Sequence, residues 1–333
     1  MNDNLKNFEL VPVNSDRVKI EKAGKFENEY VYDLEVEDDS HTFVGNNILL
    51  HNSIYVRLDS IIHRLFGTTK INWDDKVTFE KLKTFIDTKL QEVLNKHVAD
   101  YICDTFKTDQ RRIEFKREKI SSEGEYCAKK RYVVHVRNNE GLDCNKFSYT
   151  GVDVAKNELP DSIKKLLKEC VEGMIQYNWD NTKFQDKINE IYKIYNEMPI
   201  KEIAFIKNLN TPKEATGFLT SEKGAGVHAR AAQYYNQIIE KLNLLKTNDK
   251  INQGDRFYYV YLKSGNKYGI NCIAWKERYP KEFEKLFEID REKMFQKTIM
   301  SPLDDFIQHH KFANFDPNNV MIIGENGVSL FDI

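Results

Sequence analysis

The stretch VYDLEVEDDSHTFVGNNILLHNS, residues 31–53, decides how this 333-residue sequence divides into folds. Within it, the strand-like runs His41–Val44 and Ile48–Leu50 flank a turn at Gly45–Asn47. Beyond it, apolar residues recur mainly at the spacing of helices. The stretch therefore predicts an all-β segment that ends near residue 52, followed by an α+β region and then a mainly helical one.

The end of this stretch holds three residues whose side chains suit a reaction that cuts and joins chains, namely His51, Asn52 and Ser53. The Asn52 amide can attack its own backbone carbonyl, form a succinimide and cut the chain after itself. The His51 imidazole can assist by protonating the leaving amine, and the Ser53 hydroxyl can accept an acyl group. Upstream, His41 could activate the same carbonyl. The tripeptide alone is better explained as a polar loop, because short motifs often match by chance.

The whole stretch resembles the two C-terminal sequence blocks of inteins: a Val-Tyr-Asp-Leu-x-Val strand, a His-x-Phe pair, a Gly/Asn turn, an aliphatic run and a terminal His-Asn before Ser. Residues 1–30 contain neither the first nucleophile nor the Thr-x-x-His block of that family. We therefore expect the C-terminal half of a split Hint-type intein, which orders on a partner carrying the N-intein. The resemblance implies these roles: Asn52 cyclises, His51 and His41 assist, Asp33 supports the splice junctions, and Ser53 accepts the acyl group.

The remainder of the chain predicts an ordered series of strands and helices. A long helix is expected with Thr78 as its N-cap, since apolar residues from Phe79 to Ile102 form one stripe. The turn residues Ser121–Gly124 are expected to separate two strands. The expected strands are 54–58, 112–120, 131–137, 256–262 and 270–275, and the other expected helices are 162–177, 182–195, 228–246 and about 280–296.

Three segments of this remainder resemble family B DNA polymerases of the T-even phage type: SIYVRLD from Ser53, FKREKI at 115–120 and AKKRYVVHV at 128–136. In that family an Asp-Thr-Asp-Ser turn precedes the first of these segments, and its aspartates hold two Mg²⁺ ions. The sequence after the splice junction begins at the Ser of this turn, so the resemblance puts both aspartates on an N-terminal half. It also implies that Glu118 lies near the metal site.

The basic run Lys129, Lys130, Arg131 and Tyr132 matches the Lys-Lys-Arg-Tyr motif with which this family grips the minor groove near the primer end. The physical chemistry agrees, because two lysines offer point charges, an arginine offers a planar fork, and a tyrosine can pack or donate. The whole chain has a formal net charge of −2, but Lys107–Arg131 holds nine Lys or Arg against five Asp or Glu. Charge runs are usually solvated faces, so a solvated strand remains the plainer explanation of the tetrapeptide alone.

Looser matches follow in the order of the family. TGVDVAKNELPDSIKK, residues 150–165, resembles its palm-to-thumb junction, where Gly151 and Lys156 would face DNA. GVHARAAQYYNQII, residues 226–239, resembles a thumb helix that presents His228 and Arg230. Residues 268–280 and 294–306 resemble late thumb segments, with Trp275 expected in the core. The tail VSLFDI resembles a sliding-clamp tether, with Ser329, Leu330, Phe331 and Asp332 as its contacts.

These matches predict four parts: a leader (1–17), a C-intein fragment (18–52), the rear of a polymerase palm (53–150) and a thumb with a clamp-binding tail (151–333). The expected function is that of the C-terminal part of a template-directed DNA polymerase, inactive until spliced to its N-terminal half. Its expected partners are that half, primer–template DNA, dNTPs and the sliding clamp, with Mg²⁺ held mainly by the N-terminal half. Two alternatives stay open: a stand-alone thumb-like DNA-binding module, and an intein fragment that only cleaves.

Composition sets the expected compartment. No apolar run approaches the length of about 20 residues that spans a bilayer, so no membrane partner is expected. The five cysteines are scattered, odd in number and without paired metal spacing, which predicts reduced thiols in the cytoplasm, that of the host cell if a phage encodes the chain.

Overall fold

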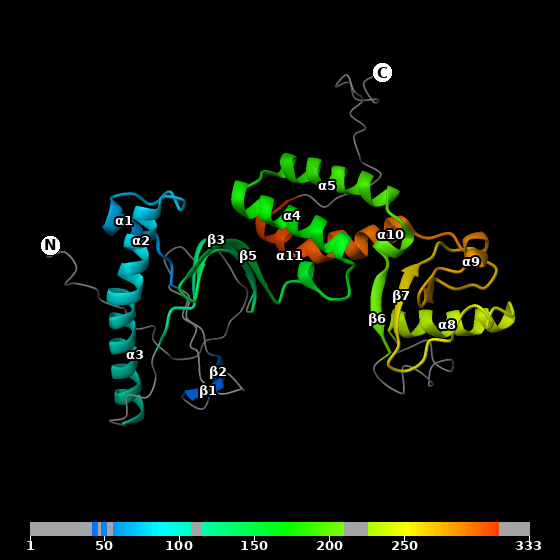
Figure 1. Cartoon of the computed structure of the whole chain (residues 1–333), viewed down its shortest axis with the longest axis horizontal. Helices are drawn as coiled ribbons and strands as arrows, with labels where there is room; N and C mark the ends of the chain where they lie inside the picture. Colours follow the sequence, from blue (N-terminus) through cyan, green and yellow to red (C-terminus); the bar gives the residue numbers. More distant parts are fainter. Residues whose placement is uncertain are drawn as a thin grey trace, which may run out of the picture. The chain divides into compact units, whose positions relative to one another are not determined.

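The computed structural model describes residues 42–45, 48–51, 56–107, 115–128, 130–209 and 226–312. The chain forms two compact units, Met1–Arg117 and Glu118–Ile333, and each is described by itself (Figure 1). No helix among the described residues is long and apolar enough to cross a membrane.

The first unit contains a two-stranded hairpin, β1 (Thr42–Gly45) and β2 (Ile48–His51). The strands are antiparallel, with Thr42 opposite His51. The two predicted strand-like runs are confirmed for these backbone positions, while Asn46 and Asn47 of the predicted turn lie outside the described residues.

The predicted strand 54–58 is wrong for its described residues, since residues 56–58 form no strand and helix α1 (Asp59–Phe66) begins directly after them. Leu58 caps α1 in a helical conformation, and Arg57 pairs with Asp59 at 2.9 Å between Nη2 and Oδ2. The buried side chains of α1 are Ile61 and Ile62. Ile61 and Ile62 follow Leu58 at spacings of three and four residues, which is the period of a helix. The apolar residues that end at Leu58 were instead interpreted as a strand.

The N-cap of the long helix in the first unit lies three residues before the predicted one, Thr78. Helix α2 (Lys76–Phe85) is capped by Asp75, whose carboxylate accepts from the Val77 N–H at 3.2 Å and the Thr78 hydroxyl at 2.5 Å. These bonds, the one from Thr78 above all, lower the pKa of Asp75. Thr78 therefore serves the cap as a donor and is not the N-cap itself. A π-helical turn η2 (Ile86–Leu90) joins α2 to α3 (Gln91–Phe106).

The FKREK segment is tied to this helix instead of pairing as a strand. The Asn95 amide bonds both backbone groups of Phe115, at 2.6 Å from its N–H and 3.2 Å to its carbonyl. Arg117 grips the Asp87 carboxylate on the π-helical turn with two bonds, one of them 2.9 Å from Nη2 to Oδ2. Because these side chains take the groups that a sheet would use, the predicted strand 112–120 is wrong for residues 115–118.

The second unit opens with an antiparallel sheet of β3 (Lys119–Ala128), β4 (Arg131–Asn139) and β5 (Leu142–Thr150), in that order. The residues Ser121–Gly124, predicted as a turn, lie inside β3, where the register shifts twice between Ile120 and Glu123. Gly124 serves close packing instead of a turn, because a Cβ there would lie 2.6 Å from Cγ1 of Val134. Glycine inside a strand marks such close approaches, and here it was mistaken for a turn signal.

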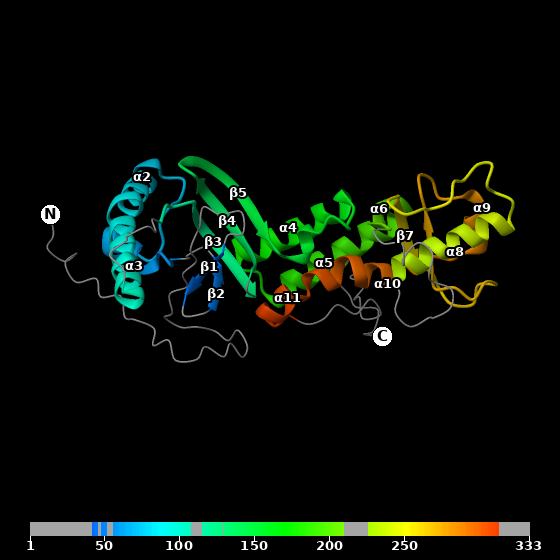
Figure 2. The ribbon, with the colours of Figure 1, turned by 90° about the horizontal axis from the view of Figure 1, so that it is seen from below.

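A helical layer follows the sheet. Helices α4 (Asp161–Tyr177) and α5 (Asn181–Glu197) confirm the predictions for 162–177 and 182–195. Both bury one apolar stripe, with Ile163, Leu167 and Phe184 fully buried. In both ribbon views these helices lie beside the C-terminal helices of the chain (Figures 1 and 2). The other elements of the layer are η3 (Asp153–Ala155), α6 (Ile200–Ile203), α10 (Arg291–Phe295), the π-helical η4 (Gln296–Met300) and α11 (Ser301–His310).

A second sheet lies on the other side of this layer, with β6 (Phe205–Asn208), β7 (Arg256–Tyr261) and β8 (Cys272–Trp275) in that order (Figure 2). Helix α8 (Val227–Lys241) packs on β7 and β8. Trp275 is fully buried, as predicted. The predicted helix 280–296 is instead two short helices, α9 (Lys281–Leu286) and α10. They are separated because Ile289 leaves the helix to bridge Leu262.

Candidate nucleic-acid interface

The β3–β4 hairpin puts the basic run at a tight turn. Ala128 at the end of β3 lies opposite Arg131 at the start of β4, so Lys130 stands at the tight connection between the strands. Lys130 has a positive φ of 59° and is exposed, while Lys129 lies outside the described residues. Among the residues that the structure describes, no ion pair to Lys130 is found. The turn therefore presents an exposed cation with no ion-pair partner among the described residues.

The end of β5 supports this turn from behind. Gly151 has a φ of 61°, and a Cβ on it would lie 2.0 Å from the carbonyl oxygen of Lys130. Only a residue without a side chain fits both the left-handed backbone and this approach. The structure thus brings Gly151 against Lys130 and gives it a structural task.

Arg131 stands at the centre of a charged group that joins three distant segments. Its Nη2 lies 3.0 Å from Oδ1 of Asp153 on η3 and 2.6 Å from Oδ2 of Asp305 on α11. Lys156 adds its Nζ at 3.0 Å from the same oxygen of Asp153. We call these four residues the Arg131 cluster; with two cations and two carboxylates its formal net charge is zero.

Two tyrosines flank the turn on neighbouring strands. Tyr126 lies opposite Tyr132, and their rings stack at 5.2 Å between centroids and 29° between planes. Tyr126 is 46% exposed, so part of the pair lies at the surface. An aromatic pair beside an exposed lysine is suited to contact the sugars or bases of a nucleic acid. Sequence reasoning missed Tyr126, although its place five residues before Arg131 in a hairpin could have predicted the pairing.

Beneath the turn the polar groups are buried. Glu125 is 6% exposed and accepts from or pairs with His310 at 2.8 Å between Oε2 and Nε2. Its second oxygen has no hydrogen-bond partner within the described ranges. Burial, then the charges of Glu125 and Asp305, raise the pKa of the nearby Cys127 thiol to about 12. Cys127 is therefore a protonated, unreactive thiol at neutral pH.

The structure does not bring Glu118 to the turn. Glu118 lies just before β3, where Lys119 is opposite Asn139, at the far end of the ladder from Lys130. Nine residues of strand separate the two ends, about 30 Å at the rise of a β-strand. The Glu118 carboxylate pairs with Lys119 at 2.6 Å. No group of three His, Cys, Asp or Glu side chains that could hold a metal ion occurs among the described residues.

His228 and Arg230 lie apart from the hairpin. They belong to the first turn of α8, which both ribbon views place at the other end of the second unit from β3 (Figures 1 and 2). Arg230 is half-buried, and its Nε has no hydrogen-bond partner in the described part of the chain. Burial raises the pKa of Tyr261 and of Cys272, and the positive charge of Arg230 opposes both increases. Arg230 thus reaches toward β7 and β8.

The other residues singled out from the sequence fall outside what the structure describes. For His51 only the backbone, at the end of β2, is described. The remaining splicing and clamp-binding residues lie outside the described residues: Asp33, His41, Asn52, Ser53, Ser329, Leu330, Phe331 and Asp332.

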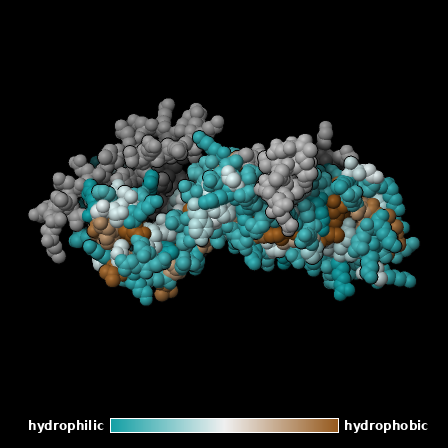
Figure 3. Space-filling view, turned by 90° about the horizontal axis from the view of Figure 1, so that it is seen from above, coloured by the Kyte–Doolittle hydropathy of each residue, from teal (hydrophilic) through white to brown (hydrophobic). Residues whose placement is uncertain are grey.

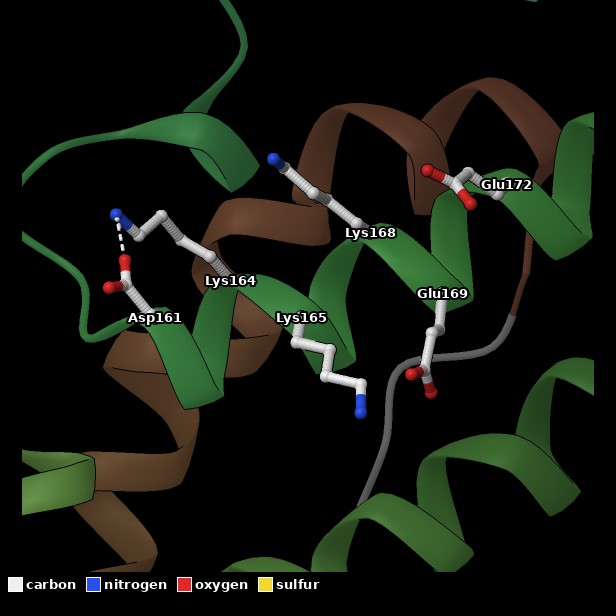
Figure 4. A pocket seen from close by; sticks show the side chains of 6 residues that line it. All are labelled: Asp161, Lys164, Lys165, Lys168, Glu169 and Glu172. Carbon is white, nitrogen blue, oxygen red and sulfur yellow. Dashed lines mark ion pairs between the residues drawn. The ribbon is translucent and has the colours of Figure 1, made fainter. Parts of the chain in front are cut away.

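A shallow hollow of about 390 Å³ on α4 was not predicted (Figure 4). Lys164 pairs with Asp161 at 2.7 Å, and Lys168 lies 5.0 Å from the centre of the Tyr149 ring, whose hydroxyl bonds Glu172. The six lining residues, Asp161, Lys164, Lys165, Lys168, Glu169 and Glu172, are three cations and three carboxylates. This balance is typical of a solvated helix face, and on the face in Figure 3 hydrophobic side chains form small separate patches among hydrophilic ones.

Comparison with known proteins relates this chain to DNA polymerases. It is 26% identical over 304 residues to the DNA-directed DNA polymerase of Escherichia phage RB69, an alignment that covers 84% of this chain and 31% of that protein. It is 24% identical over 277 residues to the DNA-directed DNA polymerase of Enterobacteria phage T4, covering 76% of the chain and 29% of the relative. It is also 22% identical over 258 residues to a DNA polymerase of Choristoneura biennis entomopoxvirus, an alignment that covers 72% of this chain and 26% of that protein. No protein-family model matches.

Most of the chain is therefore a region distantly homologous to phage and viral DNA polymerases. More particularly, it is similar to a region of the RB69 and T4 enzymes, and the chain spans less than a third of the length of these relatives.

Proposed function

We propose that the chain supplies the rear of the palm and the thumb of a family B, template-directed DNA polymerase of the T-even phage type. The observation that carries this proposal is a single alignment over 84% of the chain with the RB69 polymerase. The exposed Lys130 turn supports it, because a cation held out on a rigid hairpin suits the phosphates and groove edges of a primer–template duplex.

In this proposal the chain binds DNA and positions the primer end. Lys129 and Lys130 contact the duplex at the hairpin turn, Tyr132 packs beside them with Tyr126, and Lys156 adds charge from η3. His228 and Arg230 on α8 would meet a more distant part of the duplex, since they lie at the other end of the unit. The tail Ser329–Asp332 would tether the complex to a sliding clamp.

The resemblance to family B polymerases begins at the Ser of the metal-binding turn, Ser53, after both of its aspartates. We therefore place the metal-binding aspartates, the nucleotide site for dNTPs and the two-metal transfer chemistry on an N-terminal polymerase half. This chain would be inactive in synthesis until that half is joined to it.

The proposed joining reaction is trans-splicing by the C-intein fragment, residues 18–52. The Ser53 hydroxyl attacks the ester or thioester that links the N-terminal half to the first nucleophile of the N-intein, and the side chain of that nucleophile leaves. The Asn52 side-chain nitrogen then attacks its own carbonyl carbon. The bond between Asn52 and Ser53 breaks, His51 protonates the released amine, and an O-to-N shift makes the new peptide bond.

Splicing is tested by co-expressing the chain with an N-terminal polymerase half that carries an N-intein. The masses of the intact products are then measured by mass spectrometry. The proposal expects a ligated product whose C-terminal part starts at Ser53, and its loss in Asn52→Ala. If no such half is ligated while the chain still binds primer–template DNA, the stand-alone thumb-like module takes its place. A released segment 53–333 without ligation would favour an intein fragment that only cleaves.

A further inference from the structure

The resemblance to polymerases makes Arg131 a DNA contact, but its surroundings in the structure point to another task. Its Nη2 is shared by two carboxylates, Asp153 at 3.0 Å and Asp305 at 2.6 Å. Its Nε is buried with no hydrogen-bond partner among the described residues, and its side chain is 35% exposed. Through Nη2 alone, this guanidinium is already paired with two carboxylates of the protein.

The neighbouring lysine differs in each of these respects. Lys130 is exposed, and within the described ranges no carboxylate pairs with it. If Arg131 left its two aspartates to reach a phosphate, both carboxylates would face the anionic DNA backbone. The charges therefore favour a division of labour between the two adjacent residues.

The partners of Arg131 come from parts of the chain that must be held together. Asp153 belongs to η3, at the end of β5, and Asp305 belongs to α11, near the end of the described chain. Helix α11 is fastened to the hairpin a second time, through His310 and Glu125 on β3. Arg131 and Glu125 thus form two attachment points for one helix, on either side of Cys127.

We infer that Arg131 is a positioning residue: paired with Asp153 and Asp305, it joins the β3–β4 turn to η3 and α11 and so fixes how Lys130 is presented to duplex DNA. This inference rests on the proposed function and deepens it. Asp305 becomes a residue needed for DNA binding although it is an anion that never touches DNA.

The direction in which one substitution changes DNA affinity distinguishes a positioning role of Arg131 from a direct contact with DNA. In Asp305→Asn, loss of a negative charge and release of Arg131 would strengthen DNA binding if Arg131 contacts DNA. If Arg131 positions the turn, the same change weakens binding, by about fivefold for an ion pair about one-third exposed. Asp304→Asn is the matched control, because Asp304 is the exposed neighbour on α11, bonded to Gln308 at 2.7 Å.

The test measures the affinity of the full chain for a primer–template duplex at several salt concentrations. The inference expects Asp305→Asn and Arg131→Gln each to weaken binding about fivefold relative to Asp304→Asn, and the double variant to be no weaker than Arg131→Gln. Tighter binding by Asp305→Asn than by Asp304→Asn would overturn it. So would a double variant whose two losses multiply. Circular dichroism checks folding, and if Arg131→Gln does not fold, the comparison of Asp305→Asn with Asp304→Asn decides alone.

Lys130→Ala separates failure of this inference from failure of the proposed function. A wild-type chain that does not bind the duplex contradicts the proposed function. Three results together contradict only the positioning role of Arg131. The wild-type chain binds the duplex, Lys130→Ala weakens this binding, and Asp305→Asn has the same affinity for the duplex as Asp304→Asn.

Discussion

The imidazole Nε2 of His310 lies 2.8 Å from the carboxylate Oε2 of Glu125, joining the last turn of α11 to strand β3. Glu125 is 6% exposed, so its carboxylate has little access to water if this partner is lost. His310→Ala should therefore lower the free energy of unfolding of the second unit by about 2 kcal/mol, the usual effect of stranding a buried acceptor. Urea unfolding measures it.

The matched control is His309→Ala on the adjacent, exposed ring. The urea concentration at which half of the His309→Ala variant is unfolded should stay near that of the wild type. Equal midpoints for the two alanine variants would show that the contact with Glu125 adds nothing to stability.

Lys130→Ala should weaken binding of primer–template DNA and make it less sensitive to salt. Each phosphate neutralised by a lysine contributes a slope of about −0.9 in log K against log salt, so one lost contact should reduce the slope by about one. Fluorescence anisotropy at several salt concentrations measures both quantities. Lys146→Ala, an exposed lysine on β5 away from the turn, is the control and should keep the full slope.

Gly151→Ala should disturb the hairpin turn far more than a glycine change in open space. Gly151 combines a φ of 61° with a Cβ position 2.0 Å from the Lys130 carbonyl oxygen. Gly141 has a φ of 88°, but nothing lies within 4 Å of its Cβ position. Gly141→Ala should cost about 1–2 kcal/mol from left-handed strain alone, and Gly151→Ala more, because backbone must also move. Thermal unfolding of both variants checks this, and equal losses would mean that the contact with Lys130 is not close.

The buried thiols should resist alkylation in the native chain. Burial raises the pKa of Cys127 and Cys170 to about 12 and that of Cys272 to about 11, so few thiolates form at pH 8. Since these groups ionise more easily once unfolded, their contribution to stability is present below pH 9 and is lost as pH rises through 11 to 12. Iodoacetamide labelling with and without urea, read by peptide mass, measures this, and fast native labelling of Cys170 would contradict it.

Patterns that repeat along one element were enough to predict it. The apolar stripes of α4 and α5 and the short apolar runs of β7 and β8 are local, so they can be recognised in the sequence. Gly124 was misread because its close approach to Val134 depends on the neighbouring strand. The region 280–296 was misread because the bridge of Ile289 to Leu262 is a tertiary contact.

The candidate interface divides in the same way. The order Lys-Lys-Arg-Tyr is visible in the sequence, but the turn at Lys130 was not predicted, because the turn was expected at Ser121–Gly124. No local pattern links Arg131 to Asp305, which approach only when α11 packs on the hairpin. The sequence therefore indicates which residues are charged, while the fold determines which charges are already paired.

The most direct test of the central claim is primer extension by the chain joined to an N-terminal half with the metal-binding aspartates. A primer–template, the four dNTPs and Mg²⁺ are supplied, and the product lengths are read on a gel. The account predicts template-directed extension by the ligated protein, none by this chain alone, and greatly reduced extension when Lys130→Ala is carried into the ligated protein. A ligated protein that binds primer–template DNA and the nucleotides yet adds none would contradict the claim that this chain completes a DNA polymerase.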